Sequence, residues 1–418
     1  MSAAPPAMTA AAAGGRKPAG ERQALAALLL VVFINIAGFG IVIPLLPFYA
    51  EGFGVAAWQV TILFSAFSVG QLFGESWWGH LSDRIGRRPV LIGTILAGAI
   101  GYFLLAYAPN YTIALLLRLA GGLFAGNIST IQAYVADVSA PDTRTKRMGL
   151  IGAIFGLGFV VGPGIGGLLA DPAAGLAGFR LPLLVAGGLS AIAAASVLLF
   201  VVETRHAVDT PAAASRRAML GAAWRHPVMR TVILTTMIAT GAFSAMEAIF
   251  ALWAHARYGW GPHEVGLCFA FIGCMSALSQ WLLVGRVVDR LGEAHTLTAG
   301  LFLTAASLYA QTLAPTGGWM VFVTLFTVIG ITMTQPSTAG LISRVVGSGE
   351  QGAMLGLNGS ASAFARIGGP VLAGFLFSGV GVDAPYRIAA LLTVPAALLA
   401  LGLDRAVRRH IAHQGEMR

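Results

Sequence analysis

Long apolar runs alternate with short polar interruptions along the whole chain of 418 residues. A helix needs roughly 20 apolar residues to cross the hydrocarbon core of a bilayer, and these runs reach that length. They do not alternate polar and apolar residues at a period of two, as transmembrane β-strands do. The pattern therefore predicts an all-α integral membrane protein. Twelve transmembrane helices are predicted, at residues 24–50, 59–81, 90–109, 111–137, 147–170, 180–202, 231–256, 263–287, 294–314, 317–343, 351–379 and 385–404.

Two landmarks recur along the chain with nearly the same offset. The segment that begins at Gly79 has a weaker copy that begins at Gly285, 206 positions later, and Gly162-Pro163 recurs as Gly369-Pro370, 207 positions later. A common offset predicts a parallel duplication, with two pseudo-symmetric six-helix bundles related by an axis along the membrane normal. The predicted parts are a disordered cytoplasmic tail (1–23), an N-terminal bundle (24–203), a cytoplasmic linker (204–230), a C-terminal bundle (231–405) and a cytoplasmic tail (406–418).

Charge is sparse and unevenly distributed. Charged residues make up 10% of the chain, whereas soluble domains carry about 25%. Most of the 26 Lys and Arg residues lie in the tails and in the loops on one side of the predicted bundles, which places both termini in the cytoplasm. The net charge of +9 does not indicate nucleic-acid binding, because no basic patch is carried by a polar folded module. We expect the bundles to be surrounded by lipid.

Four motifs connect the chain to a known family. Residues 79–88 fit the pattern G-x-x-x-D-R-x-G-R-R, and Gly38-Phe39-Gly40 with Pro44 and Pro47 fits the end of a first transmembrane helix. Arg118-Leu119-Ala120-Gly121-Gly122 fits a helix 4 motif. A helix 5 pattern, G-(x8)-G-(x3)-GP-(x2)-GG, is formed by Gly149, Gly158, Gly162, Pro163, Gly166 and Gly167. With these motifs the chain resembles the major facilitator superfamily, specifically its twelve-helix drug–proton antiporters, and it is most similar to their tetracycline-efflux-like branch. This resemblance implies a monomer in a bacterial inner membrane.

The resemblance implies a conformational latch on the cytoplasmic face. In that family the helix 2–3 aspartate, here Asp83, meets a helix N-terminus of the other half and locks the outward-open state. Helix N-termini carry partial positive charge and favour anions, which supports such a contact. The alternative is that the arginines of this loop only enforce the positive-inside topology. The expected latch residues are Gly79, Asp83, Arg84, Gly86, Arg87, Arg88 and Asp137.

The helix 5 glycines are expected to form a gate. Small residues spaced by four, such as Gly158, Gly162 and Gly166, let helix backbones approach closely. Pro163 removes a backbone hydrogen bond and favours a bend. The family resemblance implies a tight, bendable gate that blocks leak, and generic close packing is the alternative.

Ionisable residues inside the predicted spans are candidates for coupling, because each costs about 2.5–3.5 kcal/mol on insertion scales. Glu247 is the best candidate for proton binding, and a solvated carboxylate near the outer interface is the alternative. The resemblance implies that Arg118 acts in helix packing or proton coupling. Arg366 either pairs with Glu247 or receives an anionic substrate. Glu75 either belongs to the latch network or faces the cavity.

One position departs from the tetracycline exporters, which usually carry an aspartate in helix 1 where this chain has Asn35. Asn35 can bind a substrate by hydrogen bonds but cannot carry a proton, so coupling would pass to Glu247 or Glu75. A few polar groups in an apolar cavity suit an amphipathic ligand. The expected cavity residues are Asn35, Phe39, Asn127, Gln132, Phe243, Phe250, Trp253, Gln335 and Arg366.

The sequence therefore predicts a proton-coupled exporter of amphipathic small molecules or drugs that works by alternating access. A metabolite exporter or an importer of the same fold is the alternative. The chain has no His-x-x-x-His, Ser/His/Asp or phosphate-binding Gly-x-x-x-x-Gly-Lys pattern, so we do not expect an enzyme. We expect no cofactor other than the proton gradient, and no metal.

Overall fold

The computed structural model describes residues 19–137, 139, 141–203, 221, 223–347 and 350–416, and within these residues the regular structure is helical throughout. The N-terminal half contains α1 (Ala19–Glu51), α2 (Ala57–Ile85), α3 (Arg87–Ala106), α4 (Tyr111–Ala125), α5 (Ile128–Asp137), α6 (Pro141–Leu169), the 3₁₀ segment η1 (Pro172–Phe179) and α7 (Arg180–Phe200). The C-terminal half contains α9 (Pro227–Tyr258), α10 (Pro262–Ser279), the π-helical segment η2 (Gln280–Val284), α11 (Gly285–Gln311), α12 (Gly317–Val345), α13 (Gln351–Gly379), α14 (Ala384–Leu401) and α15 (Leu403–Glu416).

These elements form twelve membrane spans. Ten stretches are long and apolar enough to cross a bilayer, and one of them, Pro262–Gln311, has 50 residues. The chain breaks inside it at Gly292, where φ is 76°, so α10, η2 and the start of α11 make one span and the rest of α11 makes the next. The helix α2, with 29 residues, supplies the remaining span, and α4 and α5 together cross once. The protein is thus an all-α membrane protein of twelve spans, as the hydropathy pattern predicted.

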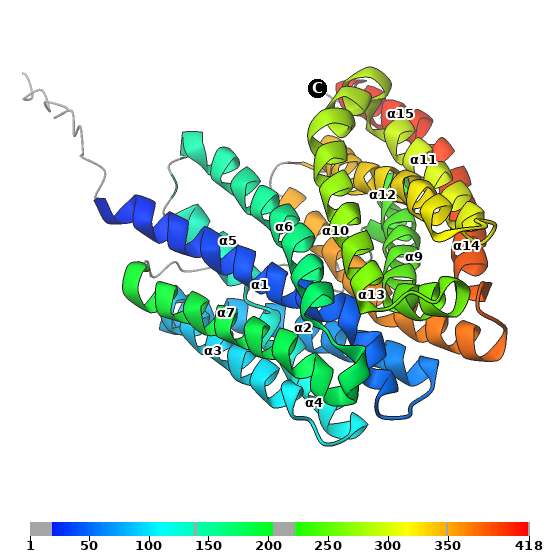
Figure 1. Ribbon diagram of the computed structural model, residues 1–418. Helices are drawn as coiled ribbons and strands as arrows, with labels where there is room; N and C mark the ends of the chain where they lie inside the picture. Colours follow the sequence, from blue (N-terminus) through cyan, green and yellow to red (C-terminus); the bar gives the residue numbers. More distant parts are fainter. Residues whose placement is uncertain are drawn as a thin grey trace, which may run out of the picture.

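The two halves repeat one another in detail. Figure 1 shows α1–α7 on one side and α9–α15 on the other. The turn between α2 and α3 is made by Gly86, with φ of 107°, and Gly292 makes the same turn 206 positions later. Only glycine adopts such φ values at low cost. Gly162 of α6 packs against α1, and Gly369 of α13 packs against Gly241 of α9 in the same way.

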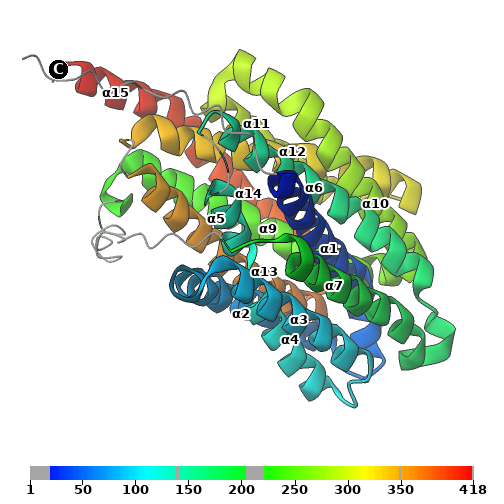
Figure 2. The ribbon, with the colours of Figure 1, turned by 90° about the vertical axis from the view of Figure 1, so that its left-hand side faces the viewer.

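The halves contact each other mainly at one end of the molecule. The Phe48 ring of α1 meets His255 of α9, and the rings of Trp58 and Phe375 stack at 5.5 Å between α2 and α13. Figures 1 and 2 show α6 beside α10, which is a further contact between the halves. These contacts involve the ends of α1, α6, α9 and α13 and the starts of α2 and α10, which we call the closed end. The halves diverge toward the opposite end, which carries α15 (Figure 1).

The ends of several elements differ from the predicted ones. Helix α1 begins at Ala19 instead of residue 24, and α9 begins at Pro227 instead of 231. Residues 406–416 of the predicted tail belong to the helix α15, which projects from the bundle in Figure 2, and residues 417 and 418 lie outside the described residues. That helix is amphipathic and buries Leu403 and Val407 in the C-terminal core. Hydropathy averaged over a span-length window does not detect a helix of this kind. Residues 1–18 of the predicted N-terminal tail and residues 204–220 of the predicted linker lie outside the described residues.

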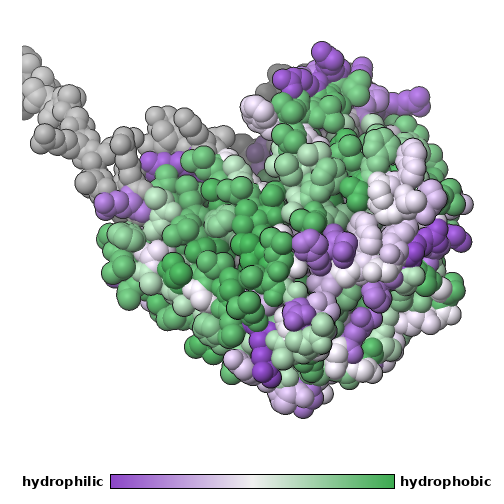
Figure 3. All heavy atoms as spheres, viewed as in Figure 1, coloured by the Kyte–Doolittle hydropathy of each residue, from purple (hydrophilic) through white to green (hydrophobic). Residues whose placement is uncertain are grey.

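Apolar side chains cover much of the outer surface. On the face drawn in Figure 3, hydrophobic residues form a continuous area over the N-terminal half, around α1, α6 and α7. Large apolar side chains of α6 and α7, such as Leu168, Leu199 and Phe200, are exposed. An apolar patch of this size fits contact with lipid and not with water.

Candidate functional site

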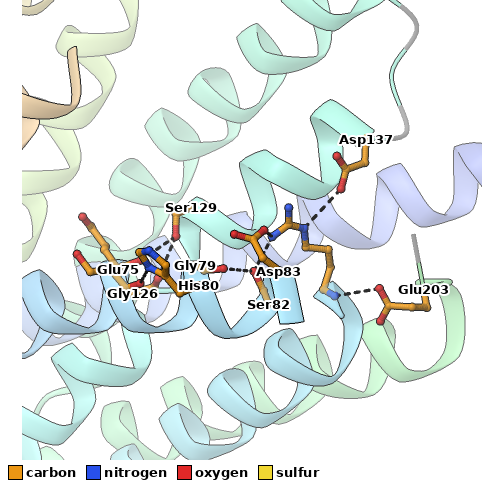
Figure 4. Close-up of polar contacts among 11 residues, drawn as sticks. Glu75, Gly79, His80, Ser82, Asp83, Gly126, Ser129, Asp137 and Glu203 are labelled. Atoms are coloured by element: carbon orange, nitrogen blue, oxygen red, sulfur yellow. Dashed lines mark hydrogen bonds and ion pairs between the residues drawn. The ribbon is translucent and has the colours of Figure 1, made fainter. Parts of the chain in front are cut away.

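The predicted latch residues form a polar network at the end of the molecule opposite the closed end (Figure 4). Arg87 lies at its centre. Its Nη1 is 2.6 Å from Asp83 Oδ1 and also donates to Ser82 Oγ at 2.6 Å, and its Nε is 3.4 Å from Asp137 Oδ2. The network ties the end of α2, the start of α3 and the end of α5 together within one half.

Glu203 is a member of this network that sequence reasoning missed. Its carboxylate accepts hydrogen bonds from the backbone N–H groups of Arg87 and Arg88, at 2.9 and 3.1 Å. It therefore caps the N-terminus of α3, where the helix dipole favours an anion. Arg88 also donates from Nη2 to the Leu198 carbonyl oxygen at 2.7 Å. An acid directly after the apolar run that ends in Val201-Val202 is the signal that could have revealed it.

The remaining latch residues surround this network. Gly86 makes the positive-φ turn, and a Cβ at this position would lie 2.3 Å from Glu203 Oε2. A residue with a side chain at position 86 would therefore prevent the Glu203 carboxylate from reaching the start of α3. A Cβ on Gly79 would lie 3.7 Å from Ser129 Oγ, an ordinary contact, so this position does not require glycine for space, and Arg84 is exposed. Among the described residues, the ion-pair partner of Asp83 is Arg87 of its own half. The expected contact of Asp83 with the other half thus remains a prediction for a different conformation.

The C-terminal half carries the same ion pair with its charges reversed. Glu293 stands 206 positions after Arg87, and Arg344 stands 207 positions after Asp137. Arg344 Nη2 and Glu293 Oε1 are 2.6 Å apart. The pair again links the start of one helix after a glycine turn to the end of the next span. The two halves therefore share the ion pair between these positions, but the acidic and basic residues have exchanged places.

The glycines of the helix 5 signature pack against different partners. A Cβ on Gly162 or Gly166 would lie 2.4 or 2.5 Å from a carbonyl oxygen of α1, and one on Gly158 would lie 2.9 Å from Ile36 Cβ. A Cβ on Gly167 would lie 2.7 Å from the Pro262 carbonyl oxygen in the other half. One on Gly149 would meet nothing within 4 Å. Three glycines thus join α6 to α1, and Gly167 joins the two halves at the closed end.

Pro163 lies inside α6, between these close contacts. Its ring fits against Gly40 of α1, where an added Cβ would lie 2.8 Å from the ring Cδ. Because proline cannot donate a backbone hydrogen bond, this is the point at which α6 can bend. The motif residues Gly40 and Pro163, from two different spans, thus make one contact.

Arg118 is buried in α4 among aromatic rings. Its guanidinium carbon lies 4.4 Å from the centroid of the Phe67 ring, and it interacts electrostatically with Tyr102. Phe67 in turn packs against Phe39 at 5.1 Å. Arg118 Nε and Asn35 Nδ2 are both buried and have no hydrogen-bond partner within the part of the chain that the structure describes. Unsatisfied buried donors are costly, which makes these two groups candidates for contact with a ligand.

Two carboxylates and one guanidinium lie between the halves. Arg366 of α13 interacts electrostatically with Glu247 of α9 and with Glu75 of α2. Two hydrogen bonds position its backbone, from Ser244 Oγ to the Arg366 carbonyl oxygen and from Ser65 Oγ to the Ile367 carbonyl oxygen. In Figure 4 the Glu75 carboxylate points away from Asp83 and the latch network. Each of the three lies roughly 15–20 Å along its helix from the nearer end, which is near the middle of a 30 Å hydrocarbon core.

The other expected cavity residues occupy varied environments. Asn127 is buried and donates from Nδ2 to Thr94 Oγ1 of its own half, and Phe243 is half-buried. Gln132 and Gln335 are exposed.

Phe250 and Trp253 do not line an open cavity in this structure. Phe250 packs against Phe269, and Trp253 donates from Nε1 to Asp383 at 2.9 Å, both in the core of the closed end. Hydropathy cannot give the rotation of a helix about its axis, because the lipid-facing and protein-facing sides of a span are both apolar. The expectation for these two residues was therefore wrong for this conformation.

Comparisons with known proteins agree with this architecture. The family model of the Major Facilitator Superfamily matches residues 28–283 and 232–416. The chain is 26% identical over 381 residues to Multidrug resistance protein 2 of Bacillus subtilis (strain 168), covering 90% of this chain and 94% of that protein. It is 26% identical over 360 residues to Quinolone resistance protein NorA of Staphylococcus aureus (strain MRSA252), covering 86% and 90%.

Solved structures show the same fold. A bacterial homologue of the human lysosomal transporter Spinster, in an inward-facing and unoccupied conformation, aligns with a TM-score of 0.77 at 15% identity, over 95% of this chain and 99% of that one. The human organic anion transporter MFSD10 (TETRAN) aligns with a TM-score of 0.69 at 23% identity, over 92% and 100%.

Proposed function

Because the chain belongs to the Major Facilitator Superfamily, we propose that it exports amphipathic small molecules in exchange for protons. The two halves rock about a central site, and the site opens alternately to the two sides of the membrane. Two relatives at 26% identity are named for multidrug and quinolone resistance, which supports drugs as the substrate class. Membership of the tetracycline-efflux-like branch is supported by the motifs alone. Asn35, which stands where tetracycline exporters usually carry an aspartate, argues against tetracycline as the substrate.

One observation carries the proposal: Glu75 and Glu247 share a single guanidinium, that of Arg366, between the halves. One arginine can neutralise only one of two ionised carboxylates. The remaining negative charge would be unpaired in a low-dielectric site, where an unpaired charge is expensive. Either a proton or a cationic group of the substrate removes that charge. Competition between the two for one carboxylate is what couples export to proton entry.

The end of the molecule opposite the closed end, where the halves diverge, also fits this cycle. The loops at this end carry most of the Lys and Arg residues, so the positive-inside rule places it, and both termini, in the cytoplasm. The structure would then receive substrate from the cytoplasmic side. The Asp83–Arg87–Asp137 network lies at this end of the molecule and joins α2, α3 and α5 there, so we assign it the latch function. A monomer suffices for this cycle, because both halves belong to one chain.

The test is proton–drug exchange by purified protein in proteoliposomes. Glu247→Gln and Glu75→Gln, singly and together, keep the shape of the side chain and remove its charge. We expect at least one of them to abolish drug-dependent proton movement while the protein still binds drug. Glu264→Gln is the matched control, since Glu264 only caps α10 through Gly261 N–H at 2.9 Å. If the double variant exchanges protons for drug as the parent does, the assignment fails.

A metabolite exporter or an importer of the same fold is the competing function. The helix 5 glycines at the closed end are present as in exporters, which argues against import. Expression in a host that lacks its own efflux pumps separates the two. Raised resistance to cationic amphipathic drugs supports drug export, and an unchanged resistance profile with altered growth on metabolites supports the alternative.

A further inference from the structure

An open groove of about 480 Å³ lies on the outside of the C-terminal half, between α11 and α14. It lies on the side of that half remote from the N-terminal half (Figure 1). Its walls include Arg290, Leu291, His295, Ala299 and Phe302 from α11, and Leu401 from α14. The groove is separate from the central site and faces the surrounding membrane.

The groove has a polar end and an apolar end. Arg290 lies at the end of the span before the turn at Gly292 and His295 at the start of the span after it, so both lie at the membrane boundary. His295 Nδ1 donates to the Leu291 carbonyl oxygen at 3.2 Å, which leaves Nε2 for another partner. Arg290 is exposed, and among the described residues no ion-pair partner neutralises it. Two cationic or donor groups thus face outward where lipid headgroups lie.

The apolar part of the groove follows one face of the helix. His295, Ala299 and Phe302 are spaced by four and three residues, so they lie in a row along the part of α11 that follows the turn at Gly292, and Leu291 lies just before that turn. From His295 to Phe302 the row is roughly 10 Å long at 1.5 Å per residue. One leaflet contributes about half of a 30 Å hydrocarbon core, so the row can follow the part of an acyl chain nearest the headgroup. Leu291, Phe302 and Leu401 are exposed apolar walls, and the small Ala299 makes the hollow between them.

We propose that this groove binds one anionic phospholipid of the cytoplasmic leaflet. Its phosphate lies between Arg290 and His295, and one acyl chain lies along α11 against Leu291, Ala299 and Phe302. A zwitterionic lipid of the same chain length gains the apolar contacts but less from the charge of Arg290. The site is independent of the transported substrate. It lies at the end of the molecule whose loops carry most of the Lys and Arg residues, and anionic lipid headgroups are attracted to that end.

Native mass spectrometry of the purified protein tests the site, with phosphatidylglycerol and phosphatidylcholine of identical chains as probes. We expect the protein to retain phosphatidylglycerol in preference to phosphatidylcholine. Arg290→Gln should lower phosphatidylglycerol retention about fivefold, the effect of one basic residue at a membrane surface. Ala299→Phe, which fills the hollow, should lower retention of both lipids.

The control is Arg286→Gln, which removes an equal charge one turn earlier, at a residue that donates to the Leu282 carbonyl oxygen and does not line the groove. It should leave retention unchanged. Equal losses in the Arg286 and Arg290 variants would reduce the effect to general surface charge and overturn the site. Equal retention of the two lipids by the parent protein, or full retention by the Arg290 variant, would overturn it as well.

Discussion

The glycines of α6 give a prediction that the signature alone could not. In Gly162→Ala the new methyl group would lie 2.4 Å from the Ala37 carbonyl oxygen of α1. Backbone cannot rotate away as a side chain can, so the two helices must separate by about 0.6 Å or more in an interior packed like a crystal. Overpacking of this kind costs about 1–3 kcal/mol. Gly149→Ala, on the same helix, meets nothing within 4 Å and should gain about 1 kcal/mol of helix propensity.

Thermal unfolding in detergent and drug efflux from vesicles measure both variants. We expect Gly162→Ala to lower the melting temperature by a few degrees and to slow efflux, and Gly149→Ala to match or exceed the parent in stability. The two substitutions add the same methyl group to the same helix, so only the neighbours differ. If both variants melt and transport alike, the close approach of α6 and α1 does not have the energetic weight we give it.

Three further outcomes follow from contacts described above. In Gly167→Ala the new methyl group clashes with the other half, at a cost of about 1–3 kcal/mol. The population of the conformation in which the halves touch at the closed end should therefore fall by roughly 5- to 150-fold relative to other conformations. Labelling of a cysteine introduced at the closed end measures this shift, and unchanged labelling contradicts it. Glu203→Gln should lower stability by about 0.5–1 kcal/mol at low salt and less at high salt, because it weakens a cap on α3; a melt that is indifferent to salt would argue against the cap. Arg87→Glu should slow transport, and Arg87→Glu with Asp137→Arg should restore part of the rate, as the reversed pair of the other half suggests; a double variant no faster than the single one would refute this.

Much of the fold could be predicted because its signals are long or repeated. Twelve spans follow from apolar length, and the duplication follows from offsets of 206 and 207 positions that the turns at Gly86 and Gly292 reproduce in three dimensions. The loop network around Arg87 follows from a specific motif. The helix α15 could not be found in this way, because its apolar stripe is shorter than a membrane span.

The site was harder to predict, since the rotation of each helix about its axis has no signal in hydropathy. Phe250 and Trp253 share α9 with Glu247 but pack in the core of the closed end. Gly149 and Gly162 share a motif but not an environment. Glu203 belongs to no motif we recognised, and only the folded chain brings it to the start of α3.

The opposite signs of the Arg87–Asp137 and Glu293–Arg344 pairs set a rule for building chimaeras of this transporter. Exchange of α3 alone for its counterpart would set Glu293 against Asp137 in one bundle and Arg87 against Arg344 in the other. Exchange of the two spans together would leave each bond intact. The smallest interchangeable module is therefore a pair of consecutive spans, and crossover points that separate the pair should yield poorly expressed protein.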